Sequence, residues 1–209
     1  MTRSKTSYSN TPVLRMDRED AYKGFFKIGR YTGVVEKFDG TPSEPFMREV
    51  FERGTAAAVL PFDAKRNRVL LIRQFLIGAH LAGVDNRPLQ VIAGMIEPGE
   101  TGMDVARREA AEEAGCEIDW VRPAQAFLPS PGGTSERIQT FVARADLPGD
   151  LGITGTFGLD EEQEDIQAQI FDADDAIAML DAGEIEAGPA VVVLSWFARH
   201  HAALRKEWS

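Results

Sequence analysis

The sequence predicts a mixed α/β domain preceded by a small β-rich N-terminal section. Strand-like runs broken by glycines fill the chain up to about residue 53. Beyond that point, strand-like runs are joined by segments with helical start and stop signals. With 209 residues and 44% hydrophobic content, the chain is long enough to bury a sizeable core.

The N-terminal section is expected to cover residues 1–53, and the first dozen or so residues are expected to form a flexible tail. Its strand-like runs are GFFKIGRYTGVVEKFDGT and FMREVFERG. The Asp39-Gly40 pair is a typical turn signal. We therefore place a domain boundary after residue 53, and residues 54–209 form the larger predicted domain.

The larger domain is expected to begin with strands and to end with two helices. Its strand candidates are TAAAVLPFD, NRVLLIRQF, PLQVIAG, IDWVRPAQAFL, RIQTFVARA and IQAQIF. The segment DLPGDLGITGTFGLDEEQED is rich in Gly and Asp, which predicts a long loop, and such loops are often functional. The closing helices are predicted over residues 173–182 and 189–206.

A further helix between these strands is predicted from Gly102 to Ala114. Thr101 and Asp104 have the spacing of a capping box, and Gly115 is a typical helix stop. One face of this helix carries small apolar residues, which favours close packing on a sheet.

Composition limits the function. Lys plus Arg is 23 and Asp plus Glu is 33, so the formal net charge is −10. An acidic chain is not typical of proteins that bind nucleic acids or anionic membranes. The single cysteine, Cys116, permits no intrachain disulfide. No apolar run is long enough for a membrane span or a signal peptide, so a cytoplasmic protein is expected.

The predicted helix carries Glu109, Glu112 and Glu113 on one side. Like charges at this spacing repel one another. A hard divalent cation such as Mg²⁺ prefers oxygen ligands and would convert this repulsion into attraction. A solvated acidic face is the alternative, but it leaves the adjoining glycine-containing loop GMIEPGE unexplained.

This stretch resembles the signature sequence of the Nudix hydrolases. That pattern is Gly, five residues, Glu, seven residues, Arg-Glu, an apolar residue, any residue, Glu-Glu, any residue, Gly and an apolar residue. Every fixed position of the pattern is matched, by Gly94, Glu100, Arg108, Glu109, Ala110, Glu112, Glu113, Gly115 and Cys116. The resemblance implies an αβα sandwich with a mixed sheet that binds Mg²⁺, or Mn²⁺, and hydrolyses a nucleoside diphosphate linked to another group.

The resemblance also implies roles for these residues. Glu109 and Glu113 would be metal ligands, and the carbonyl of Ala93 a further one. Glu112 would serve as a ligand or as a supporting catalytic group, and Arg108 would orient the glutamates.

Outside this stretch, the chain is similar to the ADP-ribose pyrophosphatase branch of the family from about residue 22 to residue 208. The segments that carry the similarity are YKGFF, REVFERG, LLIRQF, AGMIEPGE, SPGGTSER and DEEQEDI. By this resemblance, Glu162 would be the general base and Glu164 a further metal ligand. A solvated acidic loop is the alternative for both.

The same resemblance implies a substrate site that includes the N-terminal section. The residues expected to contact substrate are Phe25, Phe26, Arg48, Glu49, Met95, Gly133, Thr134, Ser135 and Glu136. Phe25 or Phe26 would stack on adenine across a homodimer whose N-terminal sections are swapped. Core packing is the alternative for the phenylalanines, and an ordinary turn is the alternative for SPGGTSER.

One position departs from this branch. Relatives often have an arginine two residues after the Arg-Gln pair, where this chain has Leu76. That arginine usually contacts substrate, so Arg73 or Arg137 would have to replace it.

The predicted activity is hydrolysis of ADP-ribose to AMP and ribose 5-phosphate. Hydrolysis of another nucleoside diphosphate sugar, such as GDP-mannose, is the first alternative. A sensor that binds ADP-ribose without turnover is the second, although such sensors usually lose the signature glutamates that this chain keeps. RNA decapping is disfavoured by the acidic charge.

Overall fold

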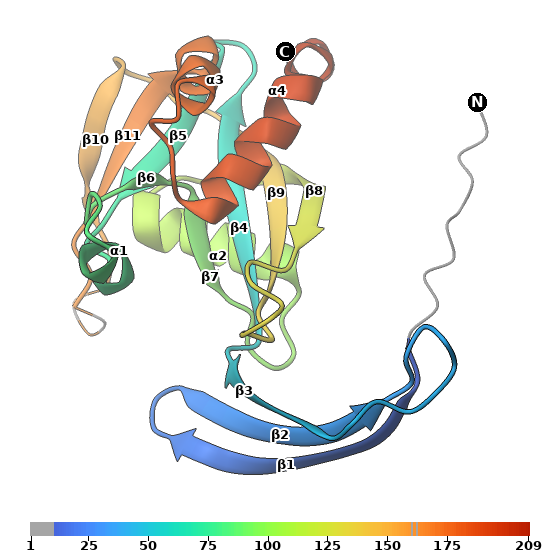
Figure 1. Ribbon diagram of the computed structural model, residues 1–209. Helices are drawn as coiled ribbons and strands as arrows, with labels where there is room; N and C mark the ends of the chain where they lie inside the picture. Colours follow the sequence, from blue (N-terminus) through green and yellow to red (C-terminus); the bar gives the residue numbers. More distant parts are fainter. Residues whose placement is uncertain (1–10, 160, 162) are drawn as a thin grey trace, which may run out of the picture. The chain divides into compact units, whose positions relative to one another are not determined.

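A computed structural model describes residues 11–159, 161 and 163–209 (Figure 1). Glu162, the predicted general base, lies outside the described residues. The chain forms two compact units. The first contains the residues up to Arg53 together with Ser130–Glu136, and the second contains Gly54–Pro129 and Arg137–Ser209.

The first unit is a three-stranded antiparallel sheet in the order β1-β2-β3. The strands are β1 (Val13–Lys23), β2 (Lys27–Val35) and β3 (Phe46–Glu52). Polar contacts join all three strands, because Arg18 of β1 and Tyr31 of β2 both donate to Glu52 of β3, over 2.7 Å and 2.5 Å. These hydrogen bonds, chiefly that from Arg18, lower the pKa of Glu52 to about 2.

Segment 130–136 extends the edge of β3. The backbone N–H of Phe51 donates to the carbonyl of Gly133 over 2.9 Å, and the N–H of Ser135 donates to the carbonyl of Phe51 over 3.1 Å. Thr134 adds a side-chain bond of 2.9 Å to the same Phe51 carbonyl. These bonds pair backbone groups that the edge strand β3 would otherwise leave unpaired. Segment 130–136 is therefore held by the N-terminal sheet, although it comes much later in the sequence.

The second unit is built on an eight-stranded mixed sheet. Its main path runs β10-β11-β5-β4-β9-β8, with β6 paired to β5 and β7 paired to β4. The β4–β9 pairing is parallel and the other pairings are antiparallel. The strands are β4 (Thr55–Asp63), β5 (Arg68–Arg73), β6 (Leu89–Gln90), β7 (Ile92–Met95), β8 (Ile118–Phe127), β9 (Arg137–Ala145), β10 (Gly152–Phe157) and β11 (Ile166–Asp172).

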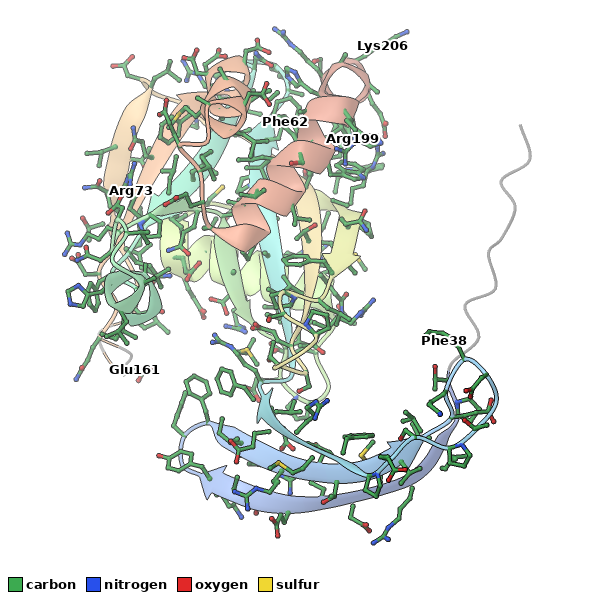
Figure 2. All side chains as sticks on the ribbon, viewed as in Figure 1. Phe38, Phe62, Arg73, Glu161, Arg199 and Lys206 are labelled. Atoms are coloured by element: carbon green, nitrogen blue, oxygen red, sulfur yellow. The ribbon has the colours of Figure 1, made fainter. Side chains whose placement is uncertain are left out.

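Helices cover both faces of this sheet, which confirms the predicted αβα layers. The helices are α1 (Ile77–Ala82), α2 (Gly102–Ala114), α3 (Ala173–Asp181) and α4 (Gly188–Trp208). Figure 1 shows α4 in front of the sheet and α2 behind it. Because side chains alternate along a strand, Phe62 of β4 joins the core under α3 and α4, while Val59 joins the core under α2. Phe62, labelled in Figure 2, packs edge-on against Phe197 of α4 at 4.8 Å between ring centroids.

The helix α2 has the predicted bounds. Thr101 accepts a hydrogen bond from the N–H of Asp104, and the Asp104 carboxylate accepts one from the N–H of Thr101 over 3.0 Å. Gly115 ends the helix with a φ of 56°, a left-handed conformation that glycine adopts without a steric penalty. None of the described helices is both long and apolar enough to cross a membrane.

Three elements were not predicted. The strand β1 and the short helix α1 were not expected, and β10 lies inside the segment expected to be a long loop. Every residue of β1 is exposed, so the strand has no buried face to give it an alternating pattern.

Candidate active site

The glutamates of the predicted cation site lie on the side of α2 that faces β7. Glu113 is 2% exposed, and its carboxylate accepts a hydrogen bond of 3.1 Å from the backbone N–H of Ala93. A Cβ on Gly94 would overlap the carboxylate of Glu109. The missing side chain at Gly94 therefore lets β7 approach the glutamate face of α2 closely.

Burial disfavours the charged form of both of these glutamates. The pKa of Glu113 is raised to about 8, chiefly by burial. The negative charges of Glu109, Glu164 and Glu112 act in the same direction. Burial also raises the pKa of Glu109, although Arg108 partly offsets this effect. Buried oxygen ligands that repel one another are the donor set that a hard divalent cation stabilises. The chemistry of this donor set thus suits Mg²⁺ or Mn²⁺.

Arg108 connects the carboxylates of the signature sequence. Its guanidinium donates to Glu109 over 2.9 Å and to Glu112 over 3.1 Å. It also contacts Glu100 over 3.3 Å. Within the described ranges, no three acidic, histidine or cysteine side chains form a group arranged to hold an ion. The described carboxylates are instead partly engaged by Arg108.

The connection between β10 and β11 brings Glu164 to this cluster. The charge of Glu164 raises the pKa of both Glu109 and Glu113, so the three carboxylates lie within electrostatic reach of one another. Glu164 therefore lies near the α2 glutamates.

Arg48 and Glu49 lie next to each other on β3, in the first unit. Glu49 pairs with Arg30 of β2, with 3.1 Å between nitrogen and oxygen. Arg48 donates to the carbonyl of Met47 over 2.8 Å, and its guanidinium lies over the ring of Phe46 at 5.6 Å. Successive residues point to opposite faces of a sheet, so these two side chains lie on different faces.

The two phenylalanines predicted to contact substrate differ in their surroundings. Phe26 packs edge-on against Phe51, with 5.0 Å between ring centroids, and Arg53 lies over its ring at 5.3 Å. Phe25 is 95% exposed. Phe26 is therefore part of the packing of the first unit. Phe25 packs edge-on against Phe26 at 4.8 Å between ring centroids and exposes most of its surface to solvent.

Segment 130–136 lies beside these aromatic residues. Glu136 pairs with Arg53 over 3.0 Å, and Thr134 accepts a hydrogen bond of 3.1 Å from the N–H of Glu136. Gly133 and Ser135 are the residues whose backbone pairs with β3. The expected substrate contacts of the N-terminal section and of SPGGTSER thus belong to the same structural unit.

Met95 and Leu76 belong to the second unit. Met95 ends β7, opposite Ala56 of β4, and Leu76 directly precedes α1. Arg73, one candidate to replace an arginine at position 76, already donates to the carbonyl of Arg87 over 2.7 Å and to an Asp85 oxygen at 3.3 Å. Arg73 is therefore partly committed to the loop before β6.

A cavity of about 660 Å³ contains none of the predicted site residues. It is lined by residues from the β4–β5 turn, the segment after α2 and the end of β9, including Lys65, Arg66, Glu117, Arg144 and Asp146. Arg66 pairs with Asp146, and Arg144 pairs with Asp119 over 2.6 Å. Since both arginines already have acidic partners, we do not assign this cavity to the substrate.

The sequence analysis missed the residues that attach the acidic connection to α2. Phe157 ends β10, and the N–H of Gly158 donates to the carbonyl of Glu112 over 3.2 Å. The available signal was a glycine shortly before the acidic run DEEQEDI.

Comparisons with known proteins agree with this geometry. The NUDIX domain model matches residues 52–192. An ADP-ribose pyrophosphatase from Escherichia coli is 42% identical over 203 residues, covering 97% of this chain and 96% of that protein. The GDP-mannose pyrophosphatase of Yersinia enterocolitica is 32% identical over 184 residues, covering 88% of this chain and 93% of that protein.

A solved structure described as an ADP compounds hydrolase has the same fold. It superposes with a TM-score of 0.64 at 20% identity, covering 92% of this chain and 96% of that one. With the signature sequence in place on α2 and the domain model matched across most of the chain, the chain belongs to the NUDIX family.

Proposed function

We propose that this protein hydrolyses the pyrophosphate of ADP-ribose to AMP and ribose 5-phosphate in a reaction that depends on Mg²⁺. The observation that carries the proposal is the buried glutamate face of α2, where Glu109 and Glu113 meet β7. The substrate class is supported by the 42% identity to an ADP-ribose pyrophosphatase over 97% of the chain.

Glu109, Glu113 and Glu164 would hold the cation, together with the carbonyl of Ala93. A bound Mg²⁺, or Mn²⁺, would neutralise charge on the pyrophosphate and lower the pKa of a bound water. Arg108 would keep Glu109 and Glu112 oriented, because it bonds both carboxylates.

Glu162 is our proposed general base, supplied by the connection between β10 and β11. A carboxylate must take the proton from the attacking water. The position of Glu164 near the α2 glutamates supports this assignment, since both residues belong to the same acidic run.

Recognition of the substrate would depend largely on the first unit. Arg48 offers a guanidinium for a phosphate oxygen, and the exposed ring of Phe25 offers a stacking surface for adenine. Phe26, Glu49, Met95 and the residues from Gly133 to Glu136 would complete the contacts.

We also propose a homodimer in which the N-terminal sections are exchanged. All of β1 is exposed, and it carries Val13, Leu14 and Met16 on its surface. An unpaired strand edge with exposed apolar residues is a typical site for association with a second chain.

We propose a cytoplasmic location. The single cysteine, Cys116, is buried and permits no intrachain disulfide, which suits a reducing compartment.

Hydrolysis of GDP-mannose is the second candidate function. Leu76 favours it, because this position lacks the arginine that ADP-ribose pyrophosphatases often carry. The 32% identity to a GDP-mannose pyrophosphatase is compatible with it.

A substrate panel distinguishes these functions. The purified protein is incubated with Mg²⁺ and ADP-ribose, GDP-mannose, UDP-glucose, NADH or diadenosine polyphosphates, and the products are separated by chromatography. We expect AMP and ribose 5-phosphate to form fastest, from ADP-ribose. Faster cleavage of another sugar nucleotide would assign a different substrate. Tight binding of ADP-ribose without turnover of any compound would indicate a sensor.

A further inference from the structure

The connection that carries Glu164 begins with a hydrogen bond to the last turn of α2. Carbonyl groups in the last turn of a helix have no partner within the helix. Here the carbonyls of Ala110 and Ala111 accept hydrogen bonds from Cys116 and Gly115. The carbonyl of Glu112 accepts the N–H of Gly158 over 3.2 Å. The first residue after β10 is therefore bonded to a residue of the signature sequence.

The ring of Phe157 strengthens this attachment. A Cβ on Gly115 would lie 2.5 Å from the Phe157 ring, and one on Gly155 would lie 3.0 Å from it. Phe157 also packs against the apolar cluster that includes Val105 and Ala110 of α2. The end of β10 thus rests on the end of α2, and two glycines make room for the ring.

Gly158 is also in direct contact with Glu164. Its φ is 105°, and a Cβ there would lie 2.7 Å from the Cβ of Glu164 and 3.1 Å from its carbonyl oxygen. The N–H of Glu164 donates to the carbonyl of Leu159 over 3.3 Å, which closes the connection on itself. Glu161, labelled in Figure 2, is exposed within this connection.

We propose that Gly158 is a positioning residue that holds the Glu164 carboxylate at the glutamate face of α2. Its N–H fixes the start of the connection to Glu112, and its missing side chain lets the backbone of Glu164 lie against it. Any other residue would meet both a left-handed φ and the atoms of Glu164. The inference rests on the proposed function in one respect, namely that Glu164 is a metal ligand.

The test compares Gly158→Ala with Gly152→Ala, a matched control. Gly152 lies at the start of β10 with a φ of 117°, and a Cβ there would meet no atom within 4 Å. Both substitutions therefore introduce the same side chain at a similar backbone conformation. Only the change at position 158 forces Glu164 to move.

Two readouts separate positioning from general destabilisation. The first is Mn²⁺ affinity, measured by electron paramagnetic resonance. We expect Gly158→Ala to weaken it about tenfold, within the range found for residues that orient metal ligands. The second is hydrogen exchange of the backbone amides at 158 and 164, which should accelerate in Gly158→Ala. Gly152→Ala should match the wild type in both. Equal Mn²⁺ affinity and equal amide protection in the two variants would overturn the inference.

The exchange measurement keeps this inference separable from the proposed function. If the wild type neither binds Mn²⁺ nor hydrolyses ADP-ribose, the function fails, while amide protection still shows whether Gly158 holds Glu164. If Gly158→Ala does not fold, Phe157→Leu replaces it, since that change loosens the same attachment at Gly115. Unchanged amide protection at position 164 in Phe157→Leu would then contradict the inference.

Discussion

At the scale of single residues, the Glu113 side chain is deeply buried and lies near other negatively charged glutamates. Its pKa is raised to about 8 from an ordinary value of 4.5, chiefly because the side chain is buried. Between these two pH values, the folded protein keeps a proton that the unfolded chain has released. The folded state therefore loses stability as pH rises from about 4.5 to about 8.

The first prediction is that the metal-free protein loses stability over this pH range because of Glu113. The loss is about 5 kcal/mol for a shift of this size, at about 1.36 kcal/mol per pKa unit. Glu113→Gln should remove most of it, since glutamine does not ionise and can still accept the Ala93 hydrogen bond. Urea unfolding with EDTA, repeated from pH 5 to pH 8.5, measures the slope. Identical slopes in the two proteins would show that Glu113 has an ordinary pKa in the folded state.

Glu162 gives a second prediction. Glu162→Gln should lower turnover of ADP-ribose by at least about 10²-fold, because general bases contribute on this scale. Its Mn²⁺ affinity should stay close to that of the wild type, because the ligands of α2 and Glu164 remain. Steady-state kinetics and Mn²⁺ titration of the same preparation check both parts. An unchanged rate would place the base elsewhere, with Glu112 the first residue to examine.

Sequence reasoning could predict that the α2 glutamates share one side of a helix, but not the contacts from other elements that hold the candidate site in place. The glutamate face could be predicted because the spacing of Glu109 and Glu113 fixes their direction on a helix. The contact between Gly158 and Glu164 could not, because it depends on the path of the chain between β10 and β11. The hydrogen bond that Arg30 donates to Glu49 likewise depends on the register of β2 and β3.

At the scale of secondary structure elements, α2 is the part of the fold most fully determined by local signals. Thr101 and Asp104 cap its start and Gly115 ends it. The helix was predicted correctly because these signals are local. The strand β1 was missed because it is stabilised by cross-strand contacts such as the pair of Arg18 with Glu52, which a local pattern does not reveal.

The third prediction concerns the cap of α2. Thr101→Ala should destabilise the protein by about 1 kcal/mol, because it removes one half of the capping box. The melting temperature should fall by about 2–4 °C for a chain of this size. Thr11→Ala, at an exposed position outside any strand or helix, is the control and should leave the melting temperature unchanged. Equal melting temperatures for both variants would mean that the cap contributes nothing measurable.

At the scale of the whole molecule, the expected site residues are divided between two units. The glutamates of α2, Met95 and Leu76 belong to the second unit, whereas Arg48, Phe25 and segment 130–136 belong to the first. The sequence analysis placed a boundary after residue 53, where the strand-like run FMREVFERG ends. It did not indicate that residues 130–136 join the N-terminal sheet, since that pairing connects distant parts of the chain.

The proposed exchange of N-terminal sections makes a fourth prediction. Light scattering should give twice the chain mass of 23.0 kDa. Arg48→Ala and Glu113→Gln should each be inactive, yet their co-expression should restore about a quarter of wild-type activity. Half of the dimers would be mixed, and one site of each mixed dimer would contain neither change. No recovery in verified mixed dimers would show that each site uses the N-terminal section of its own chain.

The central claim is that the glutamates of α2 bind a shared divalent cation. Its most direct test is a Mn²⁺ titration. The wild type and Glu113→Gln are titrated, with ADP-ribose turnover measured in parallel and with Glu117→Gln, at an exposed position just after α2, as the control. We expect Glu113→Gln to stay folded, to bind Mn²⁺ at least about tenfold more weakly and to lose turnover by orders of magnitude. Glu117→Gln should behave like the wild type. If Glu113→Gln keeps both its Mn²⁺ affinity and its turnover, the buried glutamate face of α2 is not the metal site.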